Sequence, residues 1–363
     1  MTQRERQILE CIAANPMIAQ QEISEKLGIS RSSVAVHISN LMKKGDILGK
    51  GYVLRGDHYA VVIGGANMDI GGQSFSTLTH GDSNPGQVRT SPGGVGRNIA
   101  HNLRLLGAEV RLLTAFGEDL YGKQLANSCV SLGIDLSNAL WLTNRRTSTY
   151  LYLADAGGDM ALAVSDMEIC KEISPEYLAK NLRQLDRAQV VVIDTNLPRE
   201  SLQYLAENCT VPLFCDPVST AKAEKIRPFL SRIHTLKPNK LEAELLSGVA
   251  ITTDEDVVSA ADRLLELGVQ RLFISLGADG VYVATKDQRL HMNNPPQTIV
   301  STTGCGDAFM AALVWAWMEG LDLEDTALAG LAAAGIAMEH HDTINPGLSS
   351  ETIVQRMDRM RNG

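Results

Sequence analysis

The segment from Ser301 to Phe309 combines a turn that can bind an anion with a carboxylate that can accept a proton. An apolar pair precedes it and an apolar run follows it, a pattern that indicates an extended segment, a tight turn and a helix start. Two glycines let the backbone turn sharply and approach a ligand closely. Because the N–H groups at a helix start have no partners within the helix, they can bind phosphate. The segment therefore predicts an anion hole formed by Gly304, Cys305 and Gly306.

Asp307 lies at the edge of this predicted anion hole. A carboxylate beside a bound phosphoryl group can act as a general base that takes a proton from an attacking hydroxyl. The alternative is that Asp307 only caps the N-terminus of the helix. Cys305 also leaves two alternatives, a small residue that the turn tolerates or a thiol made reactive by the helix N-terminus.

A second group of polar residues follows the short apolar run Tyr59 to Ile63, which predicts a buried strand. Asn67 and Asp69 come just after this strand. Open α/β sheets bind ligands at the carboxyl ends of their strands, so this amide and this carboxylate can hold two substrate hydroxyls. The alternative is a turn without a ligand, because glycine, asparagine and aspartate are also common turn residues.

A second glycine turn opens a second helix between residues 91 and 100. Gly93 and Gly94 allow close approach of a ligand, and Asn98 lies one turn into the helix, from where its amide can reach the same ligand. The alternatives are a bare turn or a dinucleotide-binding fingerprint. The spacing G-x-G-x-x-G is absent, which argues against a dinucleotide-dependent dehydrogenase.

Length and composition limit the remaining possibilities. The chain has 363 residues, enough for two or three domains, and a hydrophobic fraction of 44%. No apolar run approaches the roughly 20 residues that span a bilayer, and the charged N-terminus does not fit a signal peptide. The six cysteines are scattered without a C-x-x-C pair. We therefore expect a cytoplasmic protein with reduced thiols and without structural zinc.

The charge is unevenly distributed along the chain. Residues 1–56 hold eight Lys or Arg and five Asp or Glu, a net charge of +3, whereas residues 57–363 hold 25 basic and 37 acidic residues, a net charge of −12. Helical spacing and cap residues predict helices at 3–14, 20–27 and 31–44, and a small hairpin at 47–54. The division predicts a small N-terminal domain, 1–56, and a larger domain, 57–363, with different partners.

The pattern of residues 1–56 resembles a winged helix-turn-helix of bacterial regulators, with Ser30-Arg31-Ser32-Ser33-Val34 at the start of its third helix. The resemblance implies that this helix enters the major groove of operator DNA. The residues expected toward bases are Arg31, Ser32, Ser33 and His37, and those expected toward phosphates are Lys43, Lys44 and Lys50. The alternative is a helical interaction or oligomerisation module. Because +3 is weak for DNA binding by one copy, we expect a homodimer.

Two motifs together resemble a known family. Gly93-Gly94-Val95-Gly96-Arg97-Asn98 and Thr302-Thr303-Gly304-Cys305-Gly306-Asp307 are similar to the two signatures of the ribokinase-like (PfkB) carbohydrate kinases, and the resemblance runs over roughly residues 59–350. It implies an α/β fold with a mainly parallel sheet flanked by helices, and a small β lid, which we expect near 71–90 and 147–165. It also implies ATP, Mg²⁺ and phosphate transfer to a primary hydroxyl of a sugar or nucleoside.

The resemblance also assigns the nucleotide and metal residues. Asn239 and Glu242 match the N-x-x-E element of the family, which orders Mg²⁺ and its waters; the alternative is a helix cap with a glutamate in the first turn. By the same resemblance, the expected ATP-binding residues are Asn239, Ser275, Gly277, Gly280 and Asn345. Ser301 stands where the family usually has an aspartate that helps to bind a monovalent cation, so a K⁺ requirement does not carry over.

These observations predict an ATP-dependent kinase with Asp307 as its general base. The predicted substrate-binding residues are Asn67, Asp69, Gly93, Gly94 and Asn98. Within the family, the segments 92–100, 158–169 and 216–223 are most similar to pseudouridine kinases, which favours pseudouridine over another sugar or ribonucleoside. The alternative from another class is a transcription regulator whose kinase-like domain senses such a ligand.

Overall fold

The computed structural model describes residues 2–47, 58–295 and 298–362. The chain divides into two compact units, Met1–Asp57 and His58–Gly363, and each is described by itself. No helix in the described part of the chain is long and apolar enough to cross a membrane.

The first unit contains α1 (Gln3–Ala14), α2 (Gln20–Leu27) and α3 (Arg31–Lys43), which confirms the three predicted helices. Ser30 caps α3, since its side chain accepts a hydrogen bond from the N–H of Ser33. The apolar faces of the helices form one small core, which includes the buried residues Ile8, Ile12, Ile23, Val34, Ile38 and Leu41. Residues 48–54 of the predicted hairpin lie outside the described residues.

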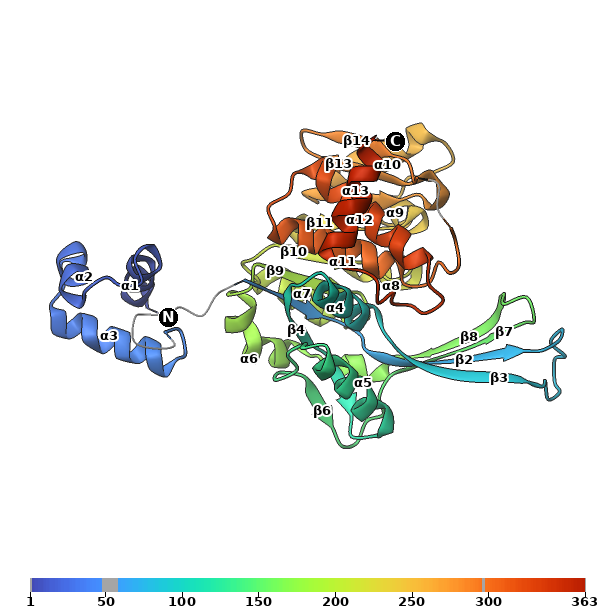
Figure 1. Ribbon diagram of the computed structural model, residues 1–363, viewed down its shortest axis with the longest axis horizontal. Coiled ribbons are helices and arrows are strands. Elements are labelled where there is room, and N and C mark those ends of the chain that lie inside the picture. The colour runs from blue at the N-terminus through green and yellow to red at the C-terminus, as the bar shows by residue number, and fades with distance from the viewer. Residues whose placement is uncertain (1, 48–57, 296–297, 363) are drawn as a thin grey trace. The chain divides into compact units, whose positions relative to one another are not determined.

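The second unit is built on an eight-stranded sheet (Figure 1). Its strands, in spatial order, are β14 (Arg289–Met292), β13 (Val281–Thr285), β12 (Arg271–Ser275), β11 (Thr235–Leu236), β10 (Leu213–Asp216), β9 (Val190–Asp194), β1 (Tyr59–Ile63) and β4 (Glu109–Leu113). From β12 to β4 all neighbours are parallel, and β13 is antiparallel to both β12 and β14. This mainly parallel sheet is the predicted architecture.

Helices cover both faces of the sheet, because successive strand residues point to opposite sides. In β1, Ala60 and Val62 join one apolar core, and Tyr59, Val61 and Ile63 join the other. The first core includes residues of α4 (Val95–Leu105), α5 (Leu120–Ser131), α11 (Cys305–Met318), α12 (Leu323–Met338) and α13 (Ser350–Asn362). The second includes residues of α6 (Pro175–Leu185), α7 (Arg199–Asn208), α8 (Thr220–Ala223), α9 (Lys240–Ser247) and α10 (Asp254–Glu266).

The strand order reverses beside β1, which pairs with β4 on one side and with β9 on the other. In an open parallel sheet, such a reversal leaves a crevice at the carboxyl ends of the strands, where ligands bind. The segment that leaves β1 and the last residue of β9, Asp194, lie at this point. The topology therefore places the segment from Gly64 to Asp69 at the expected ligand-binding edge.

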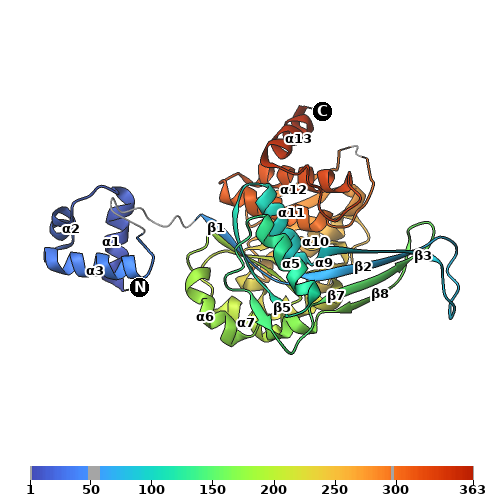
Figure 2. The same ribbon diagram turned by 60° about the horizontal axis from the view of Figure 1, so that its bottom comes forward.

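A separate four-stranded sheet forms the lid, in the order β3 (Gly86–Gly93), β2 (Asn67–Ser74), β7 (Thr149–Ala154) and β8 (Met160–Asp166). It extends away from the main sheet (Figures 1 and 2). The predicted lid segment 71–90 comprises the end of β2, the loop 75–85 and the start of β3, so it is part of a sheet and not a flap by itself, and the predicted segment 147–165 contains β7 and most of β8. Asn67 and Asp69 lie within β2, so the alternative of a simple turn at these residues is wrong. The short strands β5 (Ala115–Gly117) and β6 (Leu140–Leu142) form a third sheet.

Candidate active site

The turn before α11 requires glycine at its first position. Gly304 is the N-cap residue of α11 and has a φ of 82°, a left-handed conformation that other residues rarely adopt. A Cβ atom at Gly304 would lie 2.1 Å from the carbonyl oxygen of Thr343. No side chain caps this helix, and among the described residues the N–H groups of Gly306 and Asp307 have no acceptor. The turn thus presents free N–H groups, as an anion hole requires.

The turn before α4 is built in the same way but is closed by the protein itself. Gly94, its N-cap residue, has a φ of 99° and packs against the backbone of Gly65. The buried carboxylate of Asp194 accepts hydrogen bonds from the N–H of Gly96 at 2.9 Å and from the N–H of Gly65 at 2.8 Å. One carboxylate therefore joins the start of α4 to the segment that follows β1.

A hydrogen bond connects the two turns. The side-chain amide of Asn98 on α4 donates from Nδ2 to Oδ2 of Asp307 on α11 at 2.8 Å. Asp307 is the third residue of its helix and uses its carboxylate for this contact, so the alternative that it only caps the helix is wrong. The structure thereby brings together one predicted substrate-binding residue and the predicted base, 209 positions apart in the sequence.

The surroundings of Asp307 adjust its acidity to neutral pH. Burial raises the pKa of Asp307 to about 7, the charge of Asp216 adds to the increase, and the Asn98 hydrogen bond and Lys237 oppose it. A base with a pKa near the working pH is both available and strong enough to accept a proton. Burial raises the pKa of the Cys305 thiol to about 11. A thiol with a raised pKa is mostly protonated at neutral pH, which favours the interpretation of Cys305 as a small residue that the turn tolerates.

The other predicted substrate-binding residues form a polar cradle at the base of the lid. Asn67 donates from Nδ2 to Oδ1 of Asp69 at 2.6 Å. A Cβ atom at Gly93 would lie 2.2 Å from the carboxylate of Asp69, so glycine leaves the space that this carboxylate occupies. Burial raises the pKa of Asp69 to about 6, although the Asn67 bond and the charge of Arg97 lower it. Asp69 is therefore mostly ionised at neutral pH and can accept hydrogen bonds from hydroxyls.

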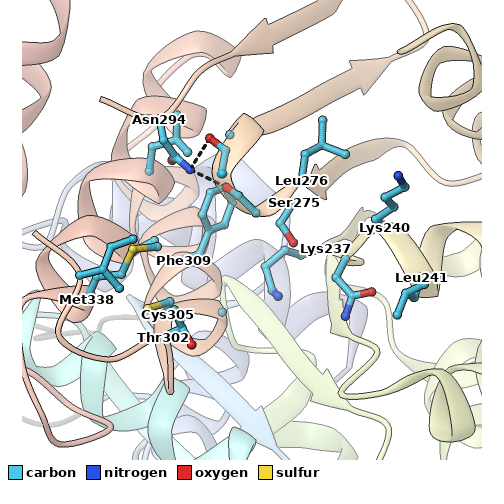
Figure 3. Close-up of a pocket in the computed structure, with 18 residues that line it drawn as sticks. Lys237, Lys240, Leu241, Ser275, Leu276, Asn294, Thr302, Cys305, Phe309 and Met338 are labelled. Atoms are coloured by element: carbon cyan, nitrogen blue, oxygen red, sulfur yellow. Dashed lines mark hydrogen bonds between the residues drawn. The ribbon is translucent and has the colours of Figure 1, made fainter. Parts of the chain in front are cut away.

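A cavity of about 550 Å³ lies beside the α11 turn, and Figure 3 shows the side chains that line it. Four of the predicted ATP-binding residues line this cavity, namely Asn239, Ser275, Gly277 and Gly280. Cys305 and Gly306 line it too, so the cavity opens onto the predicted anion hole. Phe309 and Met338 lie on one side of the cavity, and Leu241 lies on the other. The arrangement fits a flat, partly apolar group that carries phosphates.

Asn345 does not line this cavity. Its amide donates to the carbonyl oxygen of Ile336 near the end of α12, and its Oδ1 accepts from the N–H of Gly347 at 2.9 Å. Asn294, which the sequence did not single out, takes a place in the wall (Figure 3). It donates to the carbonyl oxygen of Gly277 at 2.6 Å and so holds the turn that leads to β13.

Lys237 is a second residue that the sequence reasoning missed. It lines the cavity, is nearly buried, and forms an ion pair with Asp216, with 3.1 Å between Nζ and Oδ2. A Cβ atom at Gly306 would lie 3.3 Å from Nζ of Lys237. Burial lowers the pKa of Lys237, but Asp216, Glu242 and Asp307 more than offset this, so the ammonium stays charged. The signal in the sequence was a lysine two residues before Asn239, at the end of a strand.

Asn239 and Glu242 form the helix cap that was the alternative to a metal site. Oδ1 of Asn239 accepts from the N–H of Glu242 at 2.9 Å, and the carboxylate of Glu242 accepts from the N–H of Asn239 at 2.9 Å. No group of three potential ligands among His, Cys, Asp and Glu occurs in the described part of the chain. An amide and a carboxylate at a helix start supply oxygen atoms that can contact the water shell of a Mg²⁺ ion held mainly by phosphate oxygens.

The predicted DNA-binding residues lie on α3. Arg31 and Ser32 are exposed at its N-terminus, and Ser33 and His37 are partly exposed. Lys44 is exposed and forms an ion pair with the buried Glu5, with 2.6 Å between its Nζ and Oε1 of Glu5. Lys43 is exposed, and Lys50 lies outside the described residues.

The fold and this site define a class of protein. A mainly parallel sheet with a β lid, and a glycine turn with a carboxylate beside a nucleotide-sized cavity, together form the architecture of a carbohydrate or nucleoside kinase. The sequence profile of the pfkB family carbohydrate kinases matches residues 57–350, and that of a winged helix-turn-helix DNA-binding domain matches residues 1–47. The chain belongs to the pfkB family of carbohydrate kinases and carries an N-terminal winged helix-turn-helix domain.

Two relatives from Escherichia coli are similar over nearly their whole length. An uncharacterized sugar kinase, YeiI, is 42% identical over 355 residues, which are 97% of this chain and 98% of that protein. A pseudouridine kinase is 40% identical over 307 residues, 84% of this chain and 98% of that protein. Among solved structures, a carbohydrate kinase from Agrobacterium tumefaciens has a TM-score of 0.73 at 27% identity, covering 83% of this chain and 97% of that one.

A ribokinase from Arabidopsis thaliana, solved with ribose and ATP, has the same fold. Its TM-score is 0.74 at 22% identity, over 82% of this chain and 98% of that one. Kinases of the ribokinase family use ATP and Mg²⁺ in general.

Proposed function

We propose that the chain is an ATP-dependent kinase that phosphorylates the primary hydroxyl of pseudouridine. The observation that carries the proposal is the Asn98–Asp307 hydrogen bond, because it joins the polar cradle to a carboxylate at an open anion hole. The 40% identity to the pseudouridine kinase of E. coli supports the choice of substrate. The relative with 42% identity has no assigned substrate, so another sugar or ribonucleoside is the alternative.

In this proposal, the cradle holds the sugar and Asp307 accepts the proton of its primary hydroxyl. The residues that hold the hydroxyls are Asn67, Asp69, Gly93, Gly94 and Asn98. The N–H groups of the turn from Gly304 to Asp307 stabilise the charge that develops on the transferred phosphoryl group, and the ammonium of Lys237 adds to that stabilisation. The lid closes over the sugar and excludes water, which limits wasteful hydrolysis of ATP.

The cavity beside α11 would hold the nucleotide. Ser275, Gly277 and Gly280 would contact its phosphate and ribose side, and the apolar wall formed by residues such as Phe309 would pack against the base. Asn239 and Glu242 would contact Mg²⁺ through water. The ion supplies positive charge that neutralises the phosphate oxygens when it is bound.

The test is ATP consumption by the purified protein with pseudouridine, uridine and the other ribonucleosides, ribose and fructose phosphates as acceptors. We expect turnover with pseudouridine that the Asp307→Asn variant loses. Asp307-dependent turnover with another acceptor would change the proposed substrate but support the proposed kinase activity. If no acceptor is phosphorylated although these compounds raise the melting temperature, a ligand sensor replaces the kinase.

We further propose that the N-terminal domain binds DNA as part of a homodimer and regulates transcription. The match of residues 1–47 to a winged helix-turn-helix domain and the exposed N-terminus of α3 support this. The modest net charge of +3 on residues 1–56 supports two copies on two half-sites.

The test is selection of bound sequences from random 30-base-pair duplexes, with light scattering to measure the oligomeric state. We expect one enriched palindromic sequence, bound by a dimer. The Arg31→Ala variant should not retain it. Absence of any enriched sequence, or a monomer at micromolar concentration, would contradict the proposal.

A further inference from the structure

Arg97 is a buried charge that the reaction described above does not use. It follows Gly96 on α4 and is 3% exposed. No carboxylate lies within 4 Å of its guanidinium in the described part of the chain, and its Nε has no hydrogen-bond partner there. An arginine buried without a paired carboxylate lowers the stability of the fold. The cost of burying Arg97 suggests that this residue has a functional role, and its contacts indicate which role.

The guanidinium donates three hydrogen bonds to oxygen atoms and also interacts with the thiol of Cys129, and one of the three bonds reaches the active site. Its NH1 donates to Oδ1 of Asn98 at 3.2 Å and to the carbonyl oxygen of Pro92 at 3.1 Å, and its NH2 donates to Oγ of Ser128 at 3.0 Å. Pro92 precedes the glycine turn, and Ser128 lies on α5. Arg97 is therefore held from two sides while it contacts the amide that touches Asp307.

This contact fixes which way the Asn98 amide faces. A guanidinium can only donate, so the oxygen of the amide must point toward Arg97 and its nitrogen toward Asp307. The reversed amide would place two donors together at Arg97 and two acceptors together at Asp307. Without Arg97, one of these two constraints on the amide is lost, and Asp307 has a less certain donor.

We propose that Arg97 is a positioning residue that orients the Asn98 amide and, through it, the carboxylate of Asp307. This inference rests on the proposed role of Asp307 as general base. Arg97 acts at one remove from the reacting atoms, because it contacts Asn98 and not Asp307. The orientation of the Asn98 amide is then fixed before the substrate binds, and its nitrogen donates a hydrogen bond to the ionised form of Asp307.

The charged groups around the two carboxylates determine the expected pH dependence. Asp216, Asp194 and Lys237 act on Asp307 from the ends of neighbouring strands. Asp69, His101 and Cys129 surround Arg97. Burial and the charge of Arg97 lower the pKa of His101 to about 4, and burial raises the pKa of Cys129, so neither of these two groups titrates between pH 5 and 8.

Loss of Arg97 should raise the pKa of both carboxylates that titrate between pH 5 and 8, Asp307 and Asp69. A loose Asn98 stabilises ionised Asp307 less, and a missing positive charge stabilises ionised Asp69 less, so both pKa values rise. The Arg97→Met variant should therefore move the acidic limb of kcat upward by about one pH unit. That shift corresponds to about tenfold lower kcat below pH 7 and a smaller loss at pH 9.

The experiment is a double-mutant cycle of Arg97→Met and Asn98→Ala, with kcat measured from pH 5 to 9 and melting temperature as the test of folding. We expect non-additive effects on kcat, since Arg97 acts through Asn98: the double variant should be no slower than Asn98→Ala. Ser128→Ala is the matched control, because it removes another bond of the same guanidinium, and it should leave the acidic limb in place. If Arg97→Met does not fold, Arg97→Lys replaces it in the same cycle.

Three outcomes separate the ideas. Additive losses, or an acidic limb unmoved in a folded Arg97 variant, would overturn the positioning role. A lower melting temperature alone, with the same limb as the Ser128→Ala control, would show that Arg97 is only structural. If Asp307→Asn retains normal kcat, the proposed general base is wrong, and that result does not depend on Arg97.

Discussion

The turns before α4 and α11 have the same local structure but differ in whether their free N–H groups have acceptors within the protein. Each begins with a glycine at positive φ, and neither helix has a side-chain cap. At α4 the carboxylate of Asp194 accepts from the N–H of Gly96 and the carbonyl oxygen of Gly65 accepts from the N–H of Arg97, whereas at α11 two N–H groups have no acceptor in the described part of the chain. The difference shows that a glycine turn at a helix start can bind an external anion only where the protein does not supply its own acceptors for the free N–H groups.

Removing the carboxylate of the open turn should have the largest effect on activity. We expect Asp307→Asn to lower kcat by about 10²–10⁴-fold, since it removes a general base but keeps the shape of the site. Steady-state kinetics and a direct measurement of ATP binding check this. ATP affinity should stay within about threefold, because the free N–H groups remain; a parallel loss of ATP binding would show that Asp307 holds the turn itself together.

Filling the open turn should come next. Gly304→Ala places a Cβ atom against the carbonyl oxygen of Thr343 in a left-handed conformation, so we expect a loss of stability on the order of 3 kcal/mol or more and at least tenfold lower kcat. Gly320→Ala is the control, because Gly320 has a φ of 72° with no atom within 4 Å of an added Cβ. The control should lose only about 1–2 kcal/mol in urea unfolding and no activity. Equal losses in both variants would mean that backbone strain alone accounts for Gly304.

Opening the closed turn should have a smaller effect. Asp194→Asn leaves one amide nitrogen facing N–H groups that need an acceptor, at a cost of about 1–3 kcal/mol. Because Asp194 joins the α4 turn to the segment after β1, the KM for the sugar should rise more than the KM for ATP. Kinetics with each substrate varied in turn measure this. Equal changes in both KM values would contradict the idea that the α4 turn supports the sugar site and the α11 turn binds the phosphate of ATP.

The mildest test uses pH alone. The folded-state pKa of Asp307, about 7, lies above its ordinary value of 3.8, so this group contributes stability at low pH that is lost as the pH rises through about 7. Asp307→Asn removes that loss. Since Asp307 is partly exposed, we expect the variant to gain on the order of 1–3 kcal/mol over the parent at pH 8 and little at pH 4. Activity of the parent should rise over the same pH range, and a stability difference between variant and parent that stays constant from pH 4 to pH 8 would show that Asp307 ionises as in the unfolded chain.

The sequence predicted the parts of the molecule that depend on local rules. Asn15 and Ser30 marked helix ends in the first unit, and the two glycine turns marked the starts of α4 and α11. The lid strand β2 was underestimated, because its glycines and polar residues lack the apolar alternation of a half-buried strand.

What the sequence did not predict depends on contacts between distant segments. The sequence does not single out Asp194, because its partners are the N–H groups of Gly65 and Gly96, 129 and 98 positions away. The role of Arg97 depends on the direction of one amide, which no residue pattern encodes. Asn345 was placed at the nucleotide by resemblance alone, and its loop instead uses it to end α12.

The course of β2 has a consequence for how acceptor specificity could change in this family. The strand carries Asp69 at the cradle and then continues into a sheet whose four strands pair only with one another within the described chain. In the proposed function, Asp69 and Gly93 of this sheet contact the acceptor together with Asn98 of α4, whereas α11 carries the proposed base Asp307. Exchanging the lid between related kinases should therefore transfer acceptor preference and leave the catalytic residues of α11 unchanged. New acceptor specificities can then arise without changes in α11.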